Sequence, residues 1–329
     1  MAGIVSEAER VAIDDVVAAS RAIGTRLLRT PVLSSRTLGE RIGTRAYLKA
    51  ELLQKTGSFK ARGVLTKLAS LTPEEKHRGV ISISAGNHAQ ALAYGCALEG
   101  LDCLVVMWRD ASEQKVAATR GYGAAVDLEA ADPTEAFDRL ARLRDETGRV
   151  VVHPFDDPFV VAGQGTVGLE LVEDRPDVDL VVVPVGGGGL VSGIATAVRA
   201  TRPDARVVGV EPEASRALGA ALERGEPVPV RPVSIADALN APMAGAIATR
   251  TCADLGVEMV TVSEEEIATG FRFLYERAKL AAEPGGAAAV AALLAGKARY
   301  GDAKTVVAVV SGGNVAARTA SGILDSDAR

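Results

Sequence analysis

The sequence is poor in the residues that bind metals or form disulfides. Its 329 residues include three histidines and three cysteines, and no two cysteines form a CxxC pair. A zinc site needs several such ligands at characteristic spacings. The sequence therefore predicts no metal site. An odd number of cysteines without a CxxC pair indicates that they are unpaired, and we expect them to be buried apolar residues in a reducing cytoplasm.

Basic runs and long apolar runs are also missing. The net charge is −5 and mixed along the chain, and no apolar run approaches the roughly 18 residues of a membrane helix. The first residues, MAGIVSEAER, carry acidic side chains where a signal peptide would carry basic ones. We expect a cytoplasmic protein that binds neither nucleic acid nor a membrane.

What the sequence does contain is a regular alternation of β-rich and helical segments. Val/Ile-rich runs predict strands at 80–84, 102–108, 124–129, 149–154, 178–185, 205–212, 257–263 and 304–313. Helices are expected at 87–99, 112–121, 134–147, 190–201, 264–280 and 286–297. Continuous apolar strands are covered on both faces, and strand–helix–strand repeats build parallel sheets. We therefore predict an α/β fold of two units, one over 78–152, with the boundary near HPFDDP (153–158).

The segment VVVPVGGGGLVSG places four glycines, Gly186, Gly187, Gly188 and Gly189, between a buried strand and a helix. Glycine lets backbone N–H groups approach an anion, and a helix N-terminus adds about half a unit of positive charge. Four successive glycines exceed what a tight turn needs, because each one costs backbone entropy on folding. We predict a phosphate-binding loop; the alternative is a turn that binds nothing.

A dinucleotide is one candidate for that phosphate. The pattern Gly187-x-Gly189-x-x-Ser192 is close to the Rossmann fingerprint, and Glu211 ends the next strand, where a ribose-binding acid would lie. However, Ser192 stands where glycine or alanine is usual, and the unit follows several other strands. An NAD(P)-binding dehydrogenase stays an alternative on spacing alone.

Other polar residues follow predicted strands or begin predicted helices. ISISAGNHAQ places Ser84, Asn87 and His88 at one strand end, and VVSGGN places Ser311 at another. Parallel sheets bind ligands at this edge, although Asn87 alone equally predicts a helix cap and SGGN a plain turn. AAEPGG sets Glu283 at a further helix start, where an isolated acid is usually solvated.

Lys60, in the stretch TGSFKARG, completes the set of candidates. A lysine near a helix start is usually a solvated surface residue. With three polar strand ends and no metal or histidine–nucleophile pair, however, it fits a phosphate-bearing cofactor that reacts with an amine. Pyridoxal phosphate needs a phosphate cup, a lysine for its aldehyde, and partners for its phenolic oxygen and ring nitrogen.

Six motifs identify a family resemblance. KTGSFKARG, SAGNHAQALA, HPFDDPFVVAGQGT, VPVGGGGLVSG, EPGGAAAVAALL and SGGN occur in this order over nearly the whole chain. The chain resembles the threonine dehydratase/serine racemase branch of the fold-type II (tryptophan synthase β-like) pyridoxal-phosphate enzymes. The resemblance implies two parallel-sheet, three-layer α/β domains with the active site between them. The large domain would comprise 1–77 and 153–329, the small mobile domain 78–152, and the protein would be a homodimer or homotetramer.

The resemblance also implies roles for individual residues. Lys60 would form the Schiff base and then act as general base on the Cα proton, with Phe59 beside the cofactor ring. The four glycines would hold the phosphate. Asn87 would donate to the phenolic oxygen, Ser311 would face the ring nitrogen, and Glu283 would lie close to the cofactor.

The reaction implied is a β-elimination that converts a β-hydroxy amino acid, such as L-threonine or L-serine, to a 2-oxo acid and ammonia. The substrate carboxylate would bind to the loop of Ser84, Ala85, Gly86, Asn87 and His88, in which Ser84 is also a catalytic candidate. Alternatives are a serine racemase, a dehydratase of hydroxyaspartate or of a hydroxyectoine-pathway intermediate, and a catalytically silent amino-acid-binding relative.

Three departures from the family bear on these alternatives. The racemases carry a second serine before GNH, where this chain has Ala85. The family's divalent-metal site pairs two acids six residues apart, and here Glu211 is followed by Ala217. The family's ADG reads ADA at 236–238, beside the substrate pocket. The chain also ends soon after SGGN, so the resemblance predicts no isoleucine feedback through a C-terminal regulatory domain.

Overall fold

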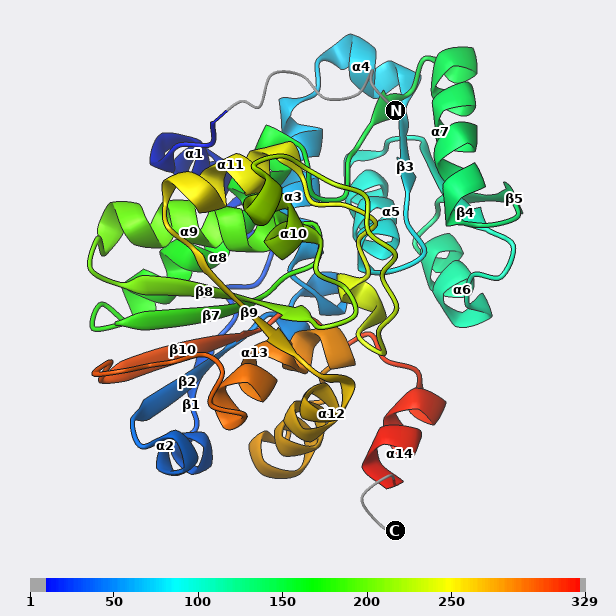
Figure 1. Cartoon of the computed structure of the whole chain (residues 1–329). Coiled ribbons are helices and arrows are strands. Elements are labelled where there is room, and N and C mark those ends of the chain that lie inside the picture. Colours follow the sequence, from blue (N-terminus) through cyan, green and yellow to red (C-terminus); the bar gives the residue numbers. More distant parts are fainter. Residues whose placement is uncertain (1–9, 326–329) are drawn as a thin grey trace.

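A computed structural model describes residues 10–325, which form two β-sheets surrounded by helices (Figure 1). The larger sheet has the strand order β1-β2-β10-β7-β8-β9, and the smaller sheet has the order β5-β4-β3-β6. Strand β1 pairs antiparallel with β2, and the other pairings in both sheets are parallel. The predicted α/β class is confirmed.

The larger sheet comprises β1 (Val32–Ser34), β2 (Arg45–Ala50), β7 (Leu180–Pro184), β8 (Arg206–Pro212), β9 (Glu258–Val262) and β10 (Thr305–Val310). The smaller sheet comprises β3 (Val80–Ile83), β4 (Cys103–Trp108), β5 (Ala125–Ala130) and β6 (Val150–Val151). The strands of the smaller sheet all lie within 78–152, and those of the larger sheet lie before and after this segment. The domain limits and the mobility of the small unit stay predictions.

The helices of the first half are α1 (Ile13–Ile23), α2 (Arg36–Ile42), α3 (Lys60–Ser70), α4 (Pro73–Arg78), α5 (Asn87–Glu99), α6 (Glu113–Gly121) and α7 (Pro133–Thr147). Those of the second half are α8 (Pro158–Asp174), α9 (Gly189–Thr201), α10 (Ala217–Arg224), α11 (Ala246–Asp254), α12 (Glu264–Phe273), α13 (Pro284–Leu294) and α14 (Ala317–Asp325). Short turns of 3-10 helix lie at η1 (Gly24–Arg26), η2 (Glu51–Leu53), η3 (Lys55–Gly57) and η4 (Asp237–Leu239), and a π-turn at η5 (Leu274–Ala278).

All eight predicted strands form, although β6 has two residues instead of the predicted run 149–154. The sequence prediction missed β1 and β2, because β1 is short and β2 reads RAYLKA, with charged residues inside it. The helix predicted at 264–280 is also shorter than expected. It ends at Phe273 and continues as the π-turn, after which Lys279 takes φ 59°.

The central strand β7 shows why its apolar run is continuous. Leu180 and Val182 pack into the core that contains Phe271 and the helix α13, whereas Val181 and Val183 pack into the core formed with α8 and α9. Successive side chains of a strand point to opposite faces, and helices cover both faces of this sheet (Figure 1). Every position of the strand is therefore buried.

A network of buried charges lies under the helix α3. Arg62 donates to Glu51 at 2.8 Å and to Glu170 at 2.7 Å, and the Nζ of Lys49 donates to Glu170 at 2.6 Å. Arg62, Lys49 and Glu51 are at most 1% exposed. Burial opposes the charge on Arg62, but the two carboxylates outweigh it and raise the pKa of the guanidinium. The network therefore binds α3 to β2, η2 and α8.

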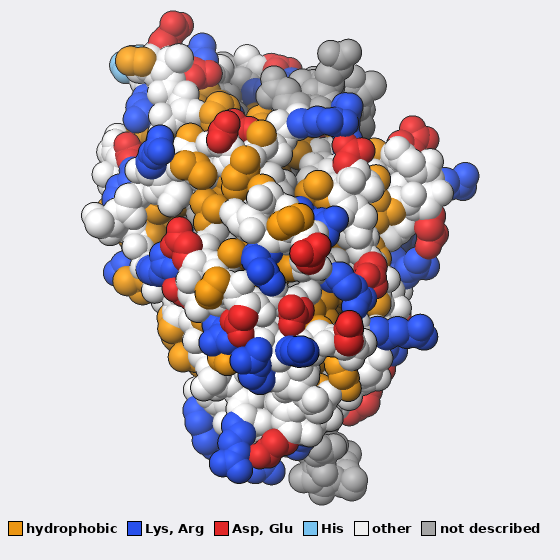
Figure 2. All heavy atoms as spheres, turned by 90° about the vertical axis from the view of Figure 1, so that its left-hand side faces the viewer, with side chains coloured by type: hydrophobic (Ala, Val, Ile, Leu, Met, Phe, Trp, Pro, Cys, Tyr) orange, Lys and Arg blue, Asp and Glu red, His pale blue; other side chains and the backbone are white. Residues whose placement is uncertain are grey.

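On the face shown in Figure 2, acidic and basic side chains are interspersed with apolar ones. Both signs of charge occur over most of this face, as in the sequence. Within residues 10–325, no helix combines the length and the apolar character that crossing a bilayer would require.

Replacing Gly193 by Ala should destabilise the larger unit, because α8 and α9 pack backbone to backbone there. A Cβ at Gly193 would lie 2.4 Å from the carbonyl oxygen of Val161 and 2.6 Å from the amide of Gly165. We expect a loss of about 1–3 kcal/mol, measured as the free energy of unfolding in urea. The control is Gly322→Ala in α14, where a Cβ meets nothing within 4 Å. Equal stability of the two variants would contradict this packing.

Candidate active site

Lys60 is the first residue of α3 and follows a tight turn. Thr56 and Gly57 take φ values of 63° and 73°, and the amide of Phe59 then donates to the carbonyl of Ser311 at 3.2 Å. This contact brings the start of α3 to the end of β10. The Nζ of Lys60 lies 5.1 Å from the centre of the Phe59 ring.

The amino group of Lys60 is directed into the protein. It donates to the carbonyl oxygen of Pro154 at 2.7 Å. Burial lowers its pKa to about 8, against the opposing effect of the negative charge on Glu283. An amine with this pKa is deprotonated far more often near neutral pH than a solvated lysine.

The four glycines connect β7 to α9, as predicted. Gly188 has φ +90°, and a Cβ there would lie 2.6 Å from the Cβ of Ala248. Cβ atoms on Gly187 and Gly189 would lie 2.4 Å and 2.8 Å from atoms of Phe155, and one on Gly186 would lie 3.2 Å from the backbone of Leu239. The loop therefore has room for backbone alone, and it ends at a helix N-terminus whose first N–H groups lack intrahelical partners. These features fit the phosphate of pyridoxal phosphate.

The loop after β3 brings the smaller sheet to the larger one. Asn87 begins α5, and its Nδ2 donates to Oε1 of Glu283 at 2.6 Å. Its Oδ1 accepts a hydrogen bond from Asn314 at 2.8 Å. Burial raises the pKa of Glu283 to about 7, and the hydrogen bond from Asn87 opposes this shift. Residues from α5, α13 and the end of β10 therefore meet at one place.

Within the same loop, Ser84 and His88 differ in what they offer. The hydroxyl of Ser84 accepts a hydrogen bond from the amide of Gly86 at 3.1 Å, and Ala85 is half-buried beside it. The Nε2 of His88 lies 3.1 Å from the carbonyl oxygen of Val152, and the residue is 2% exposed. Burial, reinforced by the positive charge of Lys60, lowers the pKa of His88 to about 3. Its imidazole is thus neutral and turned into the core. Of His88, the backbone is then the part that can bind a ligand in the loop 84–88.

Ser311 and Gly312 follow β10 and complete the site. Ser311 is 4% exposed, and Gly312 forms a β-bridge with Ser58. A Cβ on Gly312 would lie 2.2 Å from Oε1 of Glu283, so a side chain there would displace the carboxylate that Asn87 contacts. The sequence predicted Ser311 as a site residue, but it did not indicate the role of Gly312 or the contacts made by Pro154 and Phe155. The HPFDDP loop was the one local signal for the latter two.

Glu211 does not line this site. Its carboxylate accepts hydrogen bonds from the amides of Leu218 at 2.7 Å and Gly219 at 3.0 Å, in the first turn of α10. Burial raises its pKa to about 7, against these two hydrogen bonds. Both oxygens are therefore occupied by a helix start, which does not fit a ribose-binding acid. Within residues 10–325, no group of three potential metal ligands comes together.

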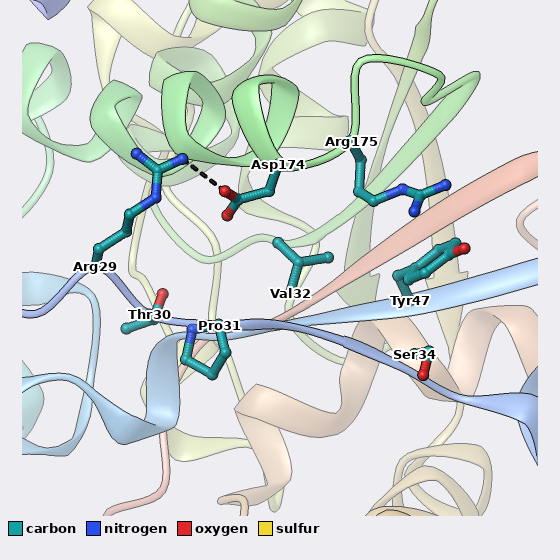
Figure 3. A pocket seen from close by; sticks show the side chains of 8 residues that line it. All are labelled: Arg29, Thr30, Pro31, Val32, Ser34, Tyr47, Asp174 and Arg175. Carbon is teal, nitrogen blue, oxygen red and sulfur yellow. Dashed lines mark hydrogen bonds and ion pairs between the residues drawn. The ribbon is translucent and has the colours of Figure 1, made fainter.

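A surface hollow of about 430 Å³ lies outside the edge strand β1 (Figure 3). Arg29 there pairs with Asp174 at 2.6 Å, and the guanidinium of Arg175 lies 4.0 Å from the centre of the Tyr47 ring. The hollow contains none of the predicted site residues, and its arginines already have partners. We do not assign the reaction to it.

The comparisons with known proteins agree with this geometry. Residues 23–312 match the family described as pyridoxal-phosphate dependent enzyme. The L-threonine ammonia-lyase of Thermotoga maritima is 44% identical over 93% of this chain and 76% of its own length. The catabolic L-threonine dehydratase of Escherichia coli is 41% identical over 93% of both chains. The structure of maize serine racemase superposes with a TM-score of 0.91 at 32% identity, covering 97% of this chain and 98% of that one.

These matches exclude the dehydrogenase alternative and confirm the resemblance seen in the six motifs. The glycine loop, Lys60 and the strand-end residues lie within the matched range. The chain belongs to the pyridoxal-phosphate dependent enzymes.

Proposed function

We propose that this protein eliminates water from a β-hydroxy amino acid, L-threonine or L-serine. The enamine that is released tautomerises to an imine, and hydrolysis of the imine by water gives a 2-oxo acid and ammonia. The observation that carries the proposal is the position of Lys60. Its buried amine, with a pKa lowered to about 8, lies at the end of a site whose other end is the glycine loop. Relatives named for L-threonine support the substrate class.

The cofactor, when bound, withdraws electrons from the amino acid and so makes its Cα–H bond acidic. In our proposal Lys60 takes the Cα proton as general base, and Phe59 packs beside the cofactor ring. The glycine loop holds the phosphate at the N-terminus of α9. A side-chain amide carries two N–H groups, so Asn87 can donate to Glu283 and still donate to the phenolic oxygen.

Ser311 is proposed to face the ring nitrogen. A neutral hydroxyl does not keep that nitrogen protonated as a carboxylate would, so less negative charge can be stored in the ring. Rapid loss of the β-hydroxyl is favoured by this arrangement over reactions that need a long-lived carbanion. The loop 84–88 is proposed to bind the substrate carboxylate through its amides and the hydroxyl of Ser84.

The remaining parts of the proposal rest on the family. The partner is a small amino acid, and we expect a homodimer or homotetramer in the cytoplasm. A serine racemase is the second candidate, because the structure of maize serine racemase is a close match. Ala85 is the residue that separates the two reactions.

Replacing Lys60 by Ala should reduce release of 2-oxo acid and ammonia from L-threonine by at least about 10²–10⁴-fold, since the general base is lost. The protein should still bind pyridoxal phosphate, but borohydride should no longer attach it to the chain. The control is Lys55→Ala, an exposed lysine in the preceding turn. Substantial activity in the Lys60 variant would refute the proposed role, and failure of the wild-type protein to release ammonia would favour a silent binder.

Replacing Gly188 by Ala should weaken binding of pyridoxal phosphate, because Gly188 has φ +90° and a Cβ there would lie 2.6 Å from Ala248. We expect the apparent Kd to rise at least about tenfold, as for a loss of 1.4 kcal/mol. Gly225→Ala is the matched control, with φ +81° and nothing within 4 Å of its Cβ. The Gly225 variant has the same backbone strain but lacks the contact. Equal affinity for the cofactor in both variants would therefore show that the glycine loop does not bind the phosphate.

Racemisation should be slow compared with elimination. A methyl group at Ala85 can neither accept nor donate a proton on the face opposite Lys60, and general acid–base catalysis contributes about 10²–10⁴-fold. With L-serine as substrate, chiral chromatography should therefore show pyruvate with almost no D-serine. Ala85→Ser should increase the yield of D-serine without improving elimination. Comparable rates of both products in the wild-type protein would contradict this assignment.

A further inference from the structure

The segment 153–157 contacts both ends of the proposed cofactor site. We propose that Phe155 is a positioning residue that fixes the separation between the amine of Lys60 and the glycine loop. This inference rests on the proposed function, since it concerns the same site. It assigns Phe155 a role that the six motifs do not reveal.

Phe155 is connected to Lys60 through the preceding residue, Pro154. The carbonyl oxygen of Pro154 accepts the hydrogen bond from Nζ of Lys60 at 2.7 Å. This carbonyl belongs to the peptide group that joins Pro154 to Phe155, and a peptide group is planar and stiff. The position of Phe155 is therefore transmitted directly to the amine.

Phe155 contacts the glycine loop directly, through both its side chain and its backbone. A Cβ on Gly187 would lie 2.4–2.6 Å from Cγ, Cδ1 and Cδ2 of the Phe155 ring. A Cβ on Gly189 would lie 2.8 Å from the carbonyl oxygen of Phe155. Gly187 and Gly189 do not have positive φ angles, so their conformation would allow alanine. Contact with Phe155, and not backbone conformation, requires glycine at these two positions.

Further bonds hold the segment in place. The Nδ1 of His153 accepts hydrogen bonds from the amides of Phe155 at 3.3 Å and Asp156 at 2.8 Å, and the two rings meet edge to face at 4.7 Å. The carboxylate of Asp156 accepts from the amides of Ala246 and Ile247, both at 3.0 Å, at the start of α11. Phe155 is thus set on a rigid turn that is bonded to a neighbouring helix.

The residue that precedes α11 also contacts the glycine loop. The amide of Gly245, just before α11, donates to the carbonyl oxygen of Gly187 at 2.9 Å. A Cβ on Gly245 would lie 2.6 Å from Oδ1 of Asp156. The loop is therefore held from two sides, by the Phe155 ring and by the residue that precedes α11.

This arrangement matters because pyridoxal phosphate is a small, stiff molecule. Its aldehyde must reach Lys60 while its phosphate occupies the glycine loop, so the protein must hold these two groups at one separation. Functional groups need positioning within about 0.5 Å. Among the contacts described above, those of the segment 153–157 connect the two groups most directly.

A double-mutant cycle tests the proposal. The Kd for pyridoxal phosphate is measured by absorbance titration of the apo-protein for the wild type, Phe155→Ala, Gly187→Ala and the double variant. Each single change should raise Kd about tenfold, within the range for contacting residues. In the double variant the ring is gone, so the added Cβ no longer collides and Gly187→Ala should cost less than about threefold more.

A second measurement separates position from affinity. After saturation with pyridoxal phosphate and reduction with borohydride, peptide mass spectrometry gives the fraction of Lys60 that carries the cofactor. This fraction should fall in Phe155→Ala and be restored in Phe155→Leu, which keeps apolar bulk. Phe159→Ala is the matched control, because Phe159 is 45% exposed and its ring lies beside the amino group of Lys67, 5.2 Å from the ring centre. Thermal unfolding of each apo-protein checks that the variants are folded.

The outcomes are distinct. If Gly187→Ala costs the same in both backgrounds, the glycine is needed for the phosphate alone and the role of Phe155 is refuted. Unchanged Kd and labelling in Phe155→Ala would refute it as well, while leaving the proposed reaction intact. A wild-type protein that binds no pyridoxal phosphate would overturn the proposed function together with this inference.

Discussion

The buried charge network around Arg62 is the constraint on which the site depends. Two positive groups, Arg62 and Lys49, face two carboxylates, Glu51 and Glu170, so the network is neutral overall. Burying charges is costly, and removing one partner from such a network typically costs about 3–5 kcal/mol. All four charges are therefore paired when α3, β2, η2 and α8 keep this arrangement. Because Arg62 lies two residues after Lys60, that geometry also fixes where α3 begins and where its first side chain is directed.

The site joins groups that originate far apart in the chain. Asn87 and Glu283 are 196 positions apart, yet they share a hydrogen bond. Each lies at the first turn of a helix, α5 or α13, and the end of β10 lies between them. The carboxyl ends of parallel strands meet along one edge of a sheet, and the bond between Asn87 and Glu283 connects one such edge to the other unit. Any change in how the two sheets pack would therefore act on this hydrogen bond and on the residues around it.

Burial sets the protonation of the groups in the site in opposite directions. It lowers the pKa of Lys60 to about 8 and raises that of Glu283 to about 7. His88 is kept neutral, with a pKa lowered to about 3. In each case desolvation is the largest cause, because charged forms lose the most when water is removed. The same dry environment that lowers the pKa of Lys60 thus limits the charge on its neighbours.

Much of the fold and the site followed from the sequence. The β-rich runs predicted eight of the strands, β3 to β10. The run is continuous in a strand such as β7 because helices cover both of its faces and it needs no polar residue. The run of four glycines before α9, and the positions of Lys60, Asn87 and Ser311 at element ends, predicted a phosphate-bearing cofactor that reacts with an amine. The strands β1 and β2 escaped prediction, since β1 is short and β2 contains charged residues that find partners only after folding.

The sequence by itself determined which chemistry the chain can carry, since that depends on residue types placed at the ends of predictable elements. The tertiary structure decided which of these residues touch. Nothing local to Gly187 indicates that Phe155 fills the space beside it, and nothing local to Glu211 indicates that its carboxylate caps α10. Such contacts join separate elements, and they depend on how helices and sheets pack and on which charges become buried, which no single stretch of sequence specifies.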